Sequence, residues 1–391
     1  MYTSSFAKQA AVSLSAALTM AACDGGNSSD SGDSPPVTSE KIVVAWTMDS
    51  GAGRIRAMST KSPWQFDGPE VVTGGDVTLH CGGGRLFALS RSEGTVSIVD
   101  LSIQQVLPVA SLEPGDPVDI AVTGPDIAYL TRRSATHLLR LDVDTGATTD
   151  VVDLSSFADN DGIPDLGSMA VHGGRLFVQI RRFNDALPFG YSPPAYIAVI
   201  DIESEQLVDT EPGIPGVQAI ELLGTAPKYK MQVLPQRMDP VPTTADLFVS
   251  ASGAMHDMGG LEIVDLGTLR SRGLAISEAF DDVGADIGPF VMVTADEGFL
   301  VSTTDLIASS HLQRFTVDGG MDPPPDLAQS IGYYAPAIVL DSDQNTLYFP
   351  IGNADESGIK VLDVASGIPL MPGLTKTDGK PTDLLPECPK P

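Results

Sequence analysis

The hydrophobic pattern of this chain repeats along its length. Residues Arg85–Asp100 read RLFALSRSEGTVSIVD, which is a short apolar run, a polar turn, a second apolar run and a closing Asp. Short apolar runs bounded by turn residues predict β-strands. A unit of several strands that recurs about every 40–50 residues predicts an all-β chain folded as a β-propeller. Related copies occur at Ile127–Asp142, Arg175–Asp201, Asp246–Asp265 and Thr346–Asp363.

The repeat predicts seven blades. The second strand of the repeat can be aligned six times, and a further blade is expected from Lys41–Gly74, which lacks an inner strand at its start. An insertion around Gly213–Pro242 obscures the inner strand of the fifth repeat. The aligned second strands are LFALSR (86–91), IAYLTR (127–132), LFVQIR (176–181), LFVSAS (247–252), FLVSTT (299–304) and LYFPIG (347–352). The expected inner strands are Val77–His80, Val118–Val122, Met169–His172, Phe290–Val293 and Ala337–Leu340.

The missing inner strand of the first blade is expected at the other end of the chain. Gly379–Leu384 (GKPTDL) resembles Gly115–Ile120 (GDPVDI), which opens the third repeat, yet the chain stops soon afterwards. A C-terminal strand that completes the first blade would close the ring and remove its open edges. We therefore expect a seven-bladed propeller over residues 41–391, with the C-terminal strand in the first blade.

An Asp ends the third strand of each repeat and is followed by small or polar residues. Such an Asp can accept hydrogen bonds from the backbone of the next residues and start a tight turn. We interpret these six acids as structural. They are Asp100, Asp142, Asp201, Asp265, Asp318 and Asp363.

One stretch of the chain resembles a known family. Residues 94–132 (GTVSIVDLSIQQVLPVASLEPGDPVDIAVTGPDIAYLTR) are similar to the bacterial YVTN-type β-propeller repeat, with Arg132 in place of the family's Asn. The resemblance extends over residues 85–145, and less fully over 169–210 and 335–370. It implies a seven-bladed exported propeller, often a surface or periplasmic binding protein. It carries no catalytic set of residues.

The N-terminus indicates export. Residues 1–22 contain one charge, Lys8, and the short apolar run Ala10–Met20, as signal peptides do. Met20-Ala21-Ala22-Cys23 resembles a bacterial lipoprotein box, in which Cys23 becomes lipidated; the alternative is an ordinary cleaved signal peptide. Residues 23–40 are polar and rich in Gly, Ser and Pro, so we expect a disordered tether. These features predict a lipid-anchored protein of the bacterial cell envelope, periplasmic or surface-exposed.

The net charge limits the partners that the chain can bind, and the cysteines predict a disulfide. The formal net charge of −28 argues against nucleic acid, because phosphate binding needs clustered Lys and Arg. Cys81 follows the inner strand of the second blade, and Cys388 follows the expected inner strand of the first. Inner strands of consecutive blades are neighbours, so we predict a disulfide between them. The partners expected are a membrane, through the lipid, and a protein or small anionic ligand. The chain itself is expected to be a monomer.

Three arginines are predicted to bind the anion. Arg91, Arg132 and Arg181 each end an aligned second strand, so they are expected to form an arc on one face near the central channel. Guanidinium groups bind carboxylate or phosphate bidentately. The alternative is that they pair with nearby loop acids. The acids considered are Asp76, Asp116, Asp119, Asp161 and Asp165.

One loop has the spacing of a calcium site. Asp159, Asp161 and Asp165 alternate with a permissive Gly162, and oxygen ligands so spaced can surround Ca²⁺. The segment resembles the calcium-binding segment of thrombospondin type 3 repeats. The alternative is a solvated Asp-Gly turn. His80 and His172 share a position at the end of an inner strand, and we interpret them as structural.

The sequence favours binding over catalysis. It contains no G-x-S-x-G, phosphate-binding loop or dinucleotide fingerprint. The leading hypothesis is a noncatalytic binding or interaction module with its ligand at the arginine arc. The alternative is a propeller enzyme of lactonase or lyase type that uses central Arg and acidic residues for catalysis.

Overall fold

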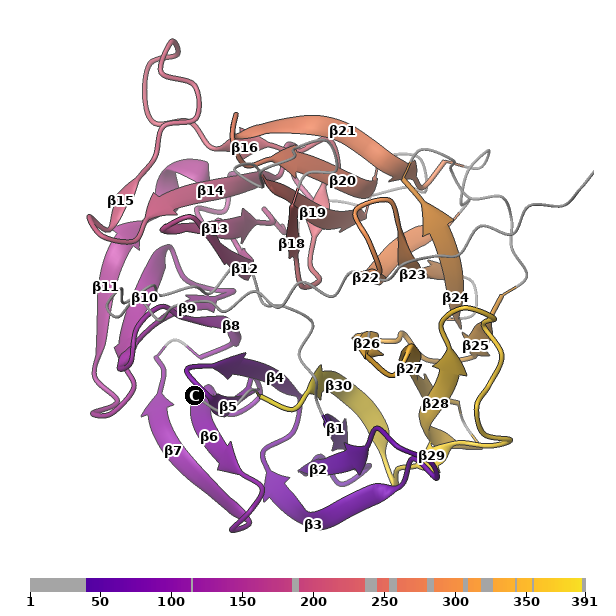
Figure 1. Cartoon of the computed structure of the whole chain (residues 1–391). Coiled ribbons are helices and arrows are strands. Elements are labelled where there is room, and N and C mark those ends of the chain that lie inside the picture. The colour runs from indigo at the N-terminus through magenta and orange to yellow at the C-terminus, as the bar shows by residue number, and fades with distance from the viewer. Residues whose placement is uncertain are drawn as a thin grey trace, which may run out of the picture.

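The computed structural model shows seven antiparallel sheets arranged in a ring (Figure 1). It describes residues 40–113, 115–184, 190–235, 245–252, 259–279, 285–304, 309–317, 326–341, 343–353 and 355–388. Within these residues the one helical segment is the 3-10 turn Ser155–Phe157. The prediction of an all-β, seven-bladed propeller is confirmed.

Each blade runs from an inner strand beside the channel to an outer strand at the rim. In the order inner to outer, blade 1 contains β30 (Lys380–Pro386), β1 (Lys41–Thr47), β2 (Gly53–Ser59) and β3 (Phe66–Thr73). Blade 2 contains β4 (Val77–Gly82), β5 (Arg85–Ser90), β6 (Thr95–Asp100) and β7 (Gln105–Ser111). Blade 3 contains β8 (Pro117–Val122), β9 (Ile127–Arg132), β10 (His137–Asp142) and β11 (Thr148–Asp153).

The remaining blades follow the same order with more irregular outer strands. Blade 4 contains β12 (Leu166–His172), β13 (Arg175–Ile180), β14 (Tyr196–Asp201), β15 (Gln206–Leu207) and β16 (Ile220–Glu221). Blade 5 contains β17 (Ala226–Pro227) and β18 (Gln232–Pro235), which both pair with β19 (Ala245–Ser252), then β20 (Gly260–Asp265) and β21 (Arg270–Ser277). Blade 6 contains β22 (Asp286–Met292), β23 (Glu297–Thr304), β24 (Ser309–Thr316) and β25 (Ala328–Ser330). Blade 7 contains β26 (Val339–Asp341), β27 (Thr346–Gly352), β28 (Ser357–Asp363) and β29 (Thr375–Lys376).

The ring closes as the sequence predicts. β30 pairs antiparallel with β1, with Leu384 opposite Val44, so the C-terminal strand is the inner strand of blade 1. Cys388 lies just after it and forms a disulfide with Cys81 of β4, with the two Cα atoms 5.3 Å apart. The bond therefore joins the inner strands of blades 1 and 2, as predicted.

Seven apolar clusters hold the blades together, one at each interface between neighbours. Six of the second strands place one buried aromatic side chain in the interface with the following blade. Burial of a side chain of that size contributes about 2–3 kcal/mol. The six aromatic residues are Phe87, Tyr129, Phe177, Phe248, Phe299 and Tyr348.

The Asp residues that end the third strands start turns. Oδ1 of Asp100 accepts the backbone N–H of Ser102 at 2.9 Å, and Oδ1 of Asp363 accepts that of Ser366 at 2.8 Å. These bonds, together with the Ser side chains, lower the pKa of both carboxyl groups. Asp142, Asp201 and Asp265 make the equivalent bond, while Asp318 lies outside the described residues. The structural interpretation is thus confirmed for the five described acids.

Candidate functional site

Side chains of the inner strands join each blade to the next around the channel. Oδ2 of Asp119 in β8 accepts the backbone N–H of Met169 in β12 at 2.7 Å. Oδ2 of Asp383 in β30 accepts that of Leu79 in β4 at 2.8 Å. We call this arrangement a clasp. Asp119 and Asp383 occupy the same place in GDPVDI and GKPTDL. The sequence similarity that predicts ring closure therefore also identifies the two Asp residues that form the clasps.

His80 has a structural role, although it does not act as a turn residue. It is 7% exposed, and its Nδ1 lies 2.7 Å from Oδ1 of Asp119, the clasp of the neighbouring blade. Its Nε2 lies 3.0 Å from the hydroxyl of Thr78. Asp119 therefore binds the blade before it and the blade after it, and it is not a partner of the arginines.

The insertion in the fifth repeat crosses the channel. The backbone carbonyl of Tyr229 accepts hydrogen bonds from Ser168 Oγ (2.9 Å) and Gln179 Nε2 (3.0 Å), both in blade 4. The next residue, Lys230, donates from Nζ to the carbonyl of Leu79 (2.8 Å) and to Oδ2 of Asp383 (3.0 Å). These last two partners belong to blades 2 and 1, which face blade 5 across the ring (Figure 1). The segment thus links blade 5 to three other blades.

The structure corrects the alignment of the arginines by one residue. The backbone N–H groups of Arg91, Arg133 and Arg181 donate to the carbonyls of Asp76, Asp116 and Asp165, each directly before an inner strand. All three of these Asp residues have a positive φ, near 50–65°. The buried aromatic residue also lies four positions earlier in each case, at Phe87, Tyr129 and Phe177. Arg133, and not Arg132, therefore occupies the position of Arg91 and Arg181.

The three arginines predicted to form the arc have separate partners. Nε and Nη2 of Arg91 both donate to Oδ2 of Asp76, at 2.9 and 2.8 Å, which is the loop-acid pairing considered as the alternative. Arg132 is 5% exposed and points to the outer strand, where Nη2 donates to Asp150 at 3.3 Å. Burial lowers the pKa of Arg132. Within the described residues, no contact joins either of these two to Arg181.

Arg181 instead belongs to a cluster on the face where the second strands end. We call Arg133, Arg181, Lys228, Tyr191 and Tyr229 the Arg–Tyr cluster. The Nζ of Lys228 lies 5.2 Å from the centre of the Tyr229 ring. The pKa of Arg181 responds to Tyr191 and Arg133, and that of Lys228 responds to Tyr229, Tyr191 and Arg181, so these groups lie close together. The side chains come from blades 3, 4 and 5 and converge beside the channel-crossing segment.

Aromatic rings and one carboxyl group border the cluster. The guanidinium of Arg133 stacks over the Phe183 ring, 4.7 Å from its centre, and Phe183 contacts Tyr191 edge-to-face at 5.3 Å. Asp165 is 6% exposed, accepts the backbone N–H of Phe183 at 2.9 Å, and lies 3.9 Å from Nε of Arg133. The cluster thus has three cations, two phenols and one adjacent carboxyl group.

The electrostatics of the cluster favour an anion. Burial and the charge of Asp161 raise the pKa of Asp165 to about 6. The hydrogen bond from Phe183 and the charges of Arg133 and Arg181 act in the opposite direction and lower this pKa. Burial and the charge of Arg133 lower the pKa of Arg181, whereas Tyr229 and Tyr191 raise that of Lys228. The buried Nε of Arg181 has no hydrogen-bond partner in the described part of the chain. A carboxylate or phosphate can accept from such groups.

Sequence reasoning found only Arg181 of this cluster. It missed Arg133, because the strands were aligned on their last Arg and not on the buried aromatic residue. Lys228 and Tyr229 fall in the insertion, which has no counterpart in the other repeats. One signal was available: Lys228-Tyr229-Lys230 places two cations in three residues, in a chain with 51 acidic and 23 basic residues.

The proposed calcium loop forms Asx-type turns. Oδ1 of Asp159 accepts the N–H of Asp161 at 3.0 Å, and Oδ1 of Asp161 accepts that of Ile163 at 2.7 Å. Oδ2 of Asp159 is buried and, by the distances between described residues, has no hydrogen-bond partner. No group of three His, Cys, Asp or Glu residues in the described ranges is placed to hold a metal ion. Calcium binding by this loop stays a prediction.

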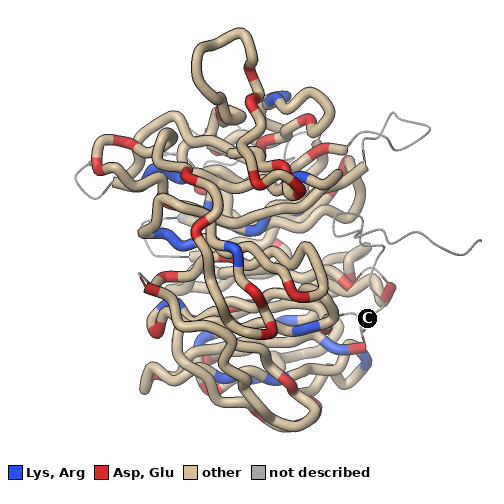
Figure 2. The backbone as a smooth tube through the Cα atoms, turned by 90° about the vertical axis from the view of Figure 1, so that its left-hand side faces the viewer, with Lys and Arg blue, Asp and Glu red and all other residues tan. Residues whose placement is uncertain are grey.

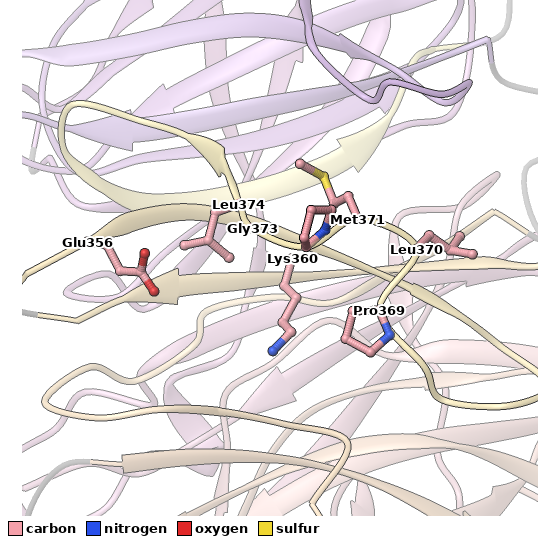
Figure 3. Close-up of a pocket in the computed structure, with 8 residues that line it drawn as sticks. Glu356, Lys360, Pro369, Leu370, Met371, Gly373 and Leu374 are labelled. Atoms are coloured by element: carbon pink, nitrogen blue, oxygen red, sulfur yellow. The ribbon is translucent and has the colours of Figure 1, made fainter.

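A hollow lies at the rim of blade 7, away from the Arg–Tyr cluster (Figure 3). It has a volume of about 520 Å³ and lies where the outer strand is interrupted between Pro369 and Leu374. Lys360 and Glu356 supply one charge of each sign, and the other lining residues are mostly apolar. This hollow therefore lacks the excess of positive charge that the Arg–Tyr cluster has.

Acidic residues are spread over the loops and strands in the side view of Figure 2, with Lys and Arg among them.

No helix in the described part of the chain is long and apolar enough to cross a membrane. The predicted signal peptide (residues 1–22), the lipidation site Cys23 and almost all of the tether (23–40) lie outside the described residues.

Comparisons with known proteins establish the fold. No family model matches the sequence, and no curated protein matches it. A candidate 6-phosphogluconolactonase from Bacteroides fragilis is similar in structure, with a TM-score of 0.58 at 13% identity over 90% of this chain and 99% of that one. Another from Bacteroides uniformis has a TM-score of 0.56 at 9% identity over 88% and 99%. A protein from Lactobacillus plantarum gives 0.54 at 13% identity over 88% and 98%. At these identities the similarity shows one thing, that the chain shares the β-propeller fold.

Proposed function

We propose that this protein is an exported, lipid-anchored β-propeller that binds a small dianionic ligand in the Arg–Tyr cluster. The observation that carries the proposal is the gathering of Arg133, Arg181 and Lys228 in one cluster, with Asp165 beside the two arginines, in a chain of net charge −28. Like charges brought together need an opposing charge to be stable. A phosphate monoester or a dicarboxylate supplies it.

The charge of the cluster indicates two negative charges on the ligand. Among the described residues the cluster has three cations, and Asp165 lies beside two of them, Arg133 and Arg181, so an excess of positive charge is left that a dianion can balance. The phenols of Tyr191 and Tyr229 add hydrogen-bond donors, and the buried Nε of Arg181 has no partner among the residues that the structure describes. Arg91 has the same place in the repeat as Arg133 and Arg181, but its guanidinium is bound by Asp76. The position alone is therefore not sufficient: Arg91 donates two hydrogen bonds to its own acid, whereas Arg133 and Arg181 share Asp165, which lies 3.9 Å from Arg133.

The direct test is calorimetric titration of the protein with inorganic phosphate and with succinate, with acetate as the monoanion for comparison. Phosphate and succinate are expected to bind more tightly than acetate, and their affinity should fall with added salt. Arg181→Ala is expected to weaken phosphate binding about tenfold, since a charge-assisted hydrogen bond contributes about 1.5–3 kcal/mol. Arg91→Ala is the matched control and should have no effect. Equal losses in both variants, or no phosphate binding, would contradict the proposal.

A second candidate is an enzyme that acts on an anionic substrate held in the same cluster. It is favoured by Asp165, whose pKa of about 6 suits a general base near neutral pH, beside two arginines. The similarity in fold to candidate 6-phosphogluconolactonases agrees with this alternative. A hydrolysis assay on 6-phosphogluconolactone with Asp165→Asn as the control tests it. Turnover that the variant abolishes would support catalysis over binding alone.

The lipid anchor has its own test. Cys23→Ser should move the protein from the membrane fraction to the soluble fraction, because a single acylated cysteine is the expected attachment. A disulfide-linked ring agrees with export to an oxidising compartment. Retention of the Ser variant in salt-washed membranes would contradict the lipoprotein hypothesis.

A further inference from the structure

The channel also contains an apolar cavity. It has a volume of about 260 Å³ and lies between the inner strands of blades 5, 6, 7 and 1. Lys230, Met231 and Gln232 line one side, and these residues follow directly after Lys228 and Tyr229 of the Arg–Tyr cluster. The rest of the wall is apolar. Its residues are Pro289, Phe290, Val291, Pro336, Ala337, Ile338, Val339, Leu340, Leu384, Leu385 and Pro386.

Two prolines lie on the cavity wall, where the strand pairing is interrupted. Proline has no backbone N–H, so it interrupts a strand ladder. In β22 the pairing shifts register between Ile287 and Phe290, around Pro289. In blade 7 the pairing of β26 starts only at Val339, after Pro336. Both inner strands line the cavity, and Pro289 and Pro336 lie on its wall.

Lys230 is the one charged group on the cavity wall. Its ammonium group donates two hydrogen bonds, to the Leu79 carbonyl and to Asp383, out of three N–H groups. The side chain is 46% exposed, although the segment on either side of it is fixed to blades 4 and 6. Lys230 and Gln232 supply the polar side chains of an otherwise apolar wall, and a few polar groups in an apolar cavity are the arrangement that orients a small ligand.

We propose that this cavity binds a small, uncharged apolar molecule of roughly ten non-hydrogen atoms that carries one hydrogen-bond acceptor. An apolar cavity of about 150 Å³ holds benzene, so about 260 Å³ accommodates a somewhat larger ring compound. The acceptor would take the third N–H of Lys230. This site is separate from the anion site, and it does not depend on the function proposed for the Arg–Tyr cluster.

Two probes of equal size test the proposal. Acetophenone carries a carbonyl where isopropylbenzene carries a methyl group, so the pair isolates the acceptor. Titrations followed by ligand-observed NMR should show saturable binding of both, with acetophenone about fivefold tighter, the effect of one net hydrogen bond. Lys230→Met should make the two affinities equal. Equal affinities for the parent protein would overturn the role of Lys230.

Filling the cavity separates this site from the anion site. Ala337→Leu should abolish binding of both probes while phosphate binding stays unchanged. Arg181→Ala should weaken phosphate binding about tenfold and leave the binding of both probes unchanged. Leu340→Phe provides a second way to fill the space if Ala337→Leu fails to fold, which circular dichroism would reveal. No saturable binding of either probe by the parent protein, or binding that survives in a folded variant with the cavity filled, would overturn the proposal.

Discussion

Asp119 and Asp383 occupy equivalent places in two copies of the repeat, and the structure uses them alike up to a point. Each carboxylate accepts the backbone N–H of the next inner strand, Met169 in one case and Leu79 in the other. Each also accepts the backbone N–H of the residue that follows it, Ile120 or Leu384. The two carboxylates differ in their third partner, which is a side chain. Asp119 is bound by His80 of the preceding blade, whereas Asp383 is bound by Lys230 from across the channel.

The difference shows how one motif serves two purposes. The Asp119 clasp is local, because all its partners lie on consecutive blades. The Asp383 clasp fixes the channel-crossing segment, which continues on one side to Lys228 and Tyr229 of the anion site and on the other to the apolar cavity. A residue from outside the repeat, Lys230, therefore connects ring closure with both candidate sites.

The largest expected effect is the loss of stability when the disulfide is removed. The disulfide lies beside the Asp383 clasp and not beside the Asp119 clasp. Cys81→Ser with Cys388→Ser should lower the free energy of unfolding by about 4 kcal/mol, since the bond closes a loop with a sequence separation of 307. Denaturant titration measures this, and the reduced parent protein is the control. A double variant as stable as the oxidised parent would show that the clasp holds the ring without the disulfide.

The two clasps can then be compared by removing their carboxylates. Asp119→Ala and Asp383→Ala should each cost about 3 kcal/mol, because each leaves two buried backbone donors and a side-chain partner without an acceptor. In the background without the disulfide, we expect Asp383→Ala to prevent folding, while Asp119→Ala remains folded. Equal behaviour of both in that background would break the distinction drawn here.

Removal of the third partners, His80 and Lys230, should lower the free energy of unfolding by different amounts. His80→Leu removes a 7% exposed partner of Asp119 and should destabilise by about 2 kcal/mol. Lys230→Met removes a half-exposed ammonium and should cost about 1 kcal/mol or less, because solvent screens the pair. Thermal melts of both variants measure the difference. The reverse order would mean that the cross-channel link is the main support of the ring.

A pH effect is expected from Asp165, which precedes β12, the strand that carries Met169. The pKa of its carboxyl group is raised to about 6 in the folded chain, above its ordinary value of 3.8. The native state therefore binds more protons than the unfolded state between these values, and the contribution of Asp165 to stability falls as pH rises from about 4 to 6. Asp165→Asn should reduce this slope in denaturant titrations across that range. An unchanged slope would contradict the raised pKa.

The smallest effect concerns calcium at Asp159, Asp161 and Asp165. Ca²⁺ at millimolar concentration should raise the melting temperature by a few degrees at most, through preferential binding to the folded state. The turn bonds of Asp159 and Asp161 already occupy one oxygen of each. Asp161→Ala should remove the rise, and Mg²⁺ serves as the control ion. No rise in the parent protein would leave the loop as a plain Asp-Gly turn.

The fold was predictable because its chemistry recurs. Each blade must bury an apolar face against the next, so the same strand pattern returns, and the repeated Pro-x-Asp motif located the strand that closes the ring. The disulfide followed from that closure. The error at Arg132 has a physical cause, since the register of these strands is set by the aromatic residue packed between blades and not by the Arg at the end.

The candidate site was less predictable because half of it lies outside the repeat. The course of Lys228–Met231 depends on the Tyr229 carbonyl meeting Ser168 and Gln179, and on Lys230 meeting Asp383. These contacts join residues far apart in the chain, and no local pattern encodes them. Likewise, only the structure shows that Arg91 has an acid partner while Arg181 lies among other cations and phenols.

The pairing of β1 with β30 sets an order of events during synthesis. β1 emerges from the ribosome long before its hydrogen-bonding neighbour β30, whose residues lie more than 330 positions later in the chain. Contacts of such separation form slowly. Until then β1 has an unpaired edge, and such edges invite association with other chains. A nascent ring of this design therefore needs protection on its way to completion, most of all for its first blade.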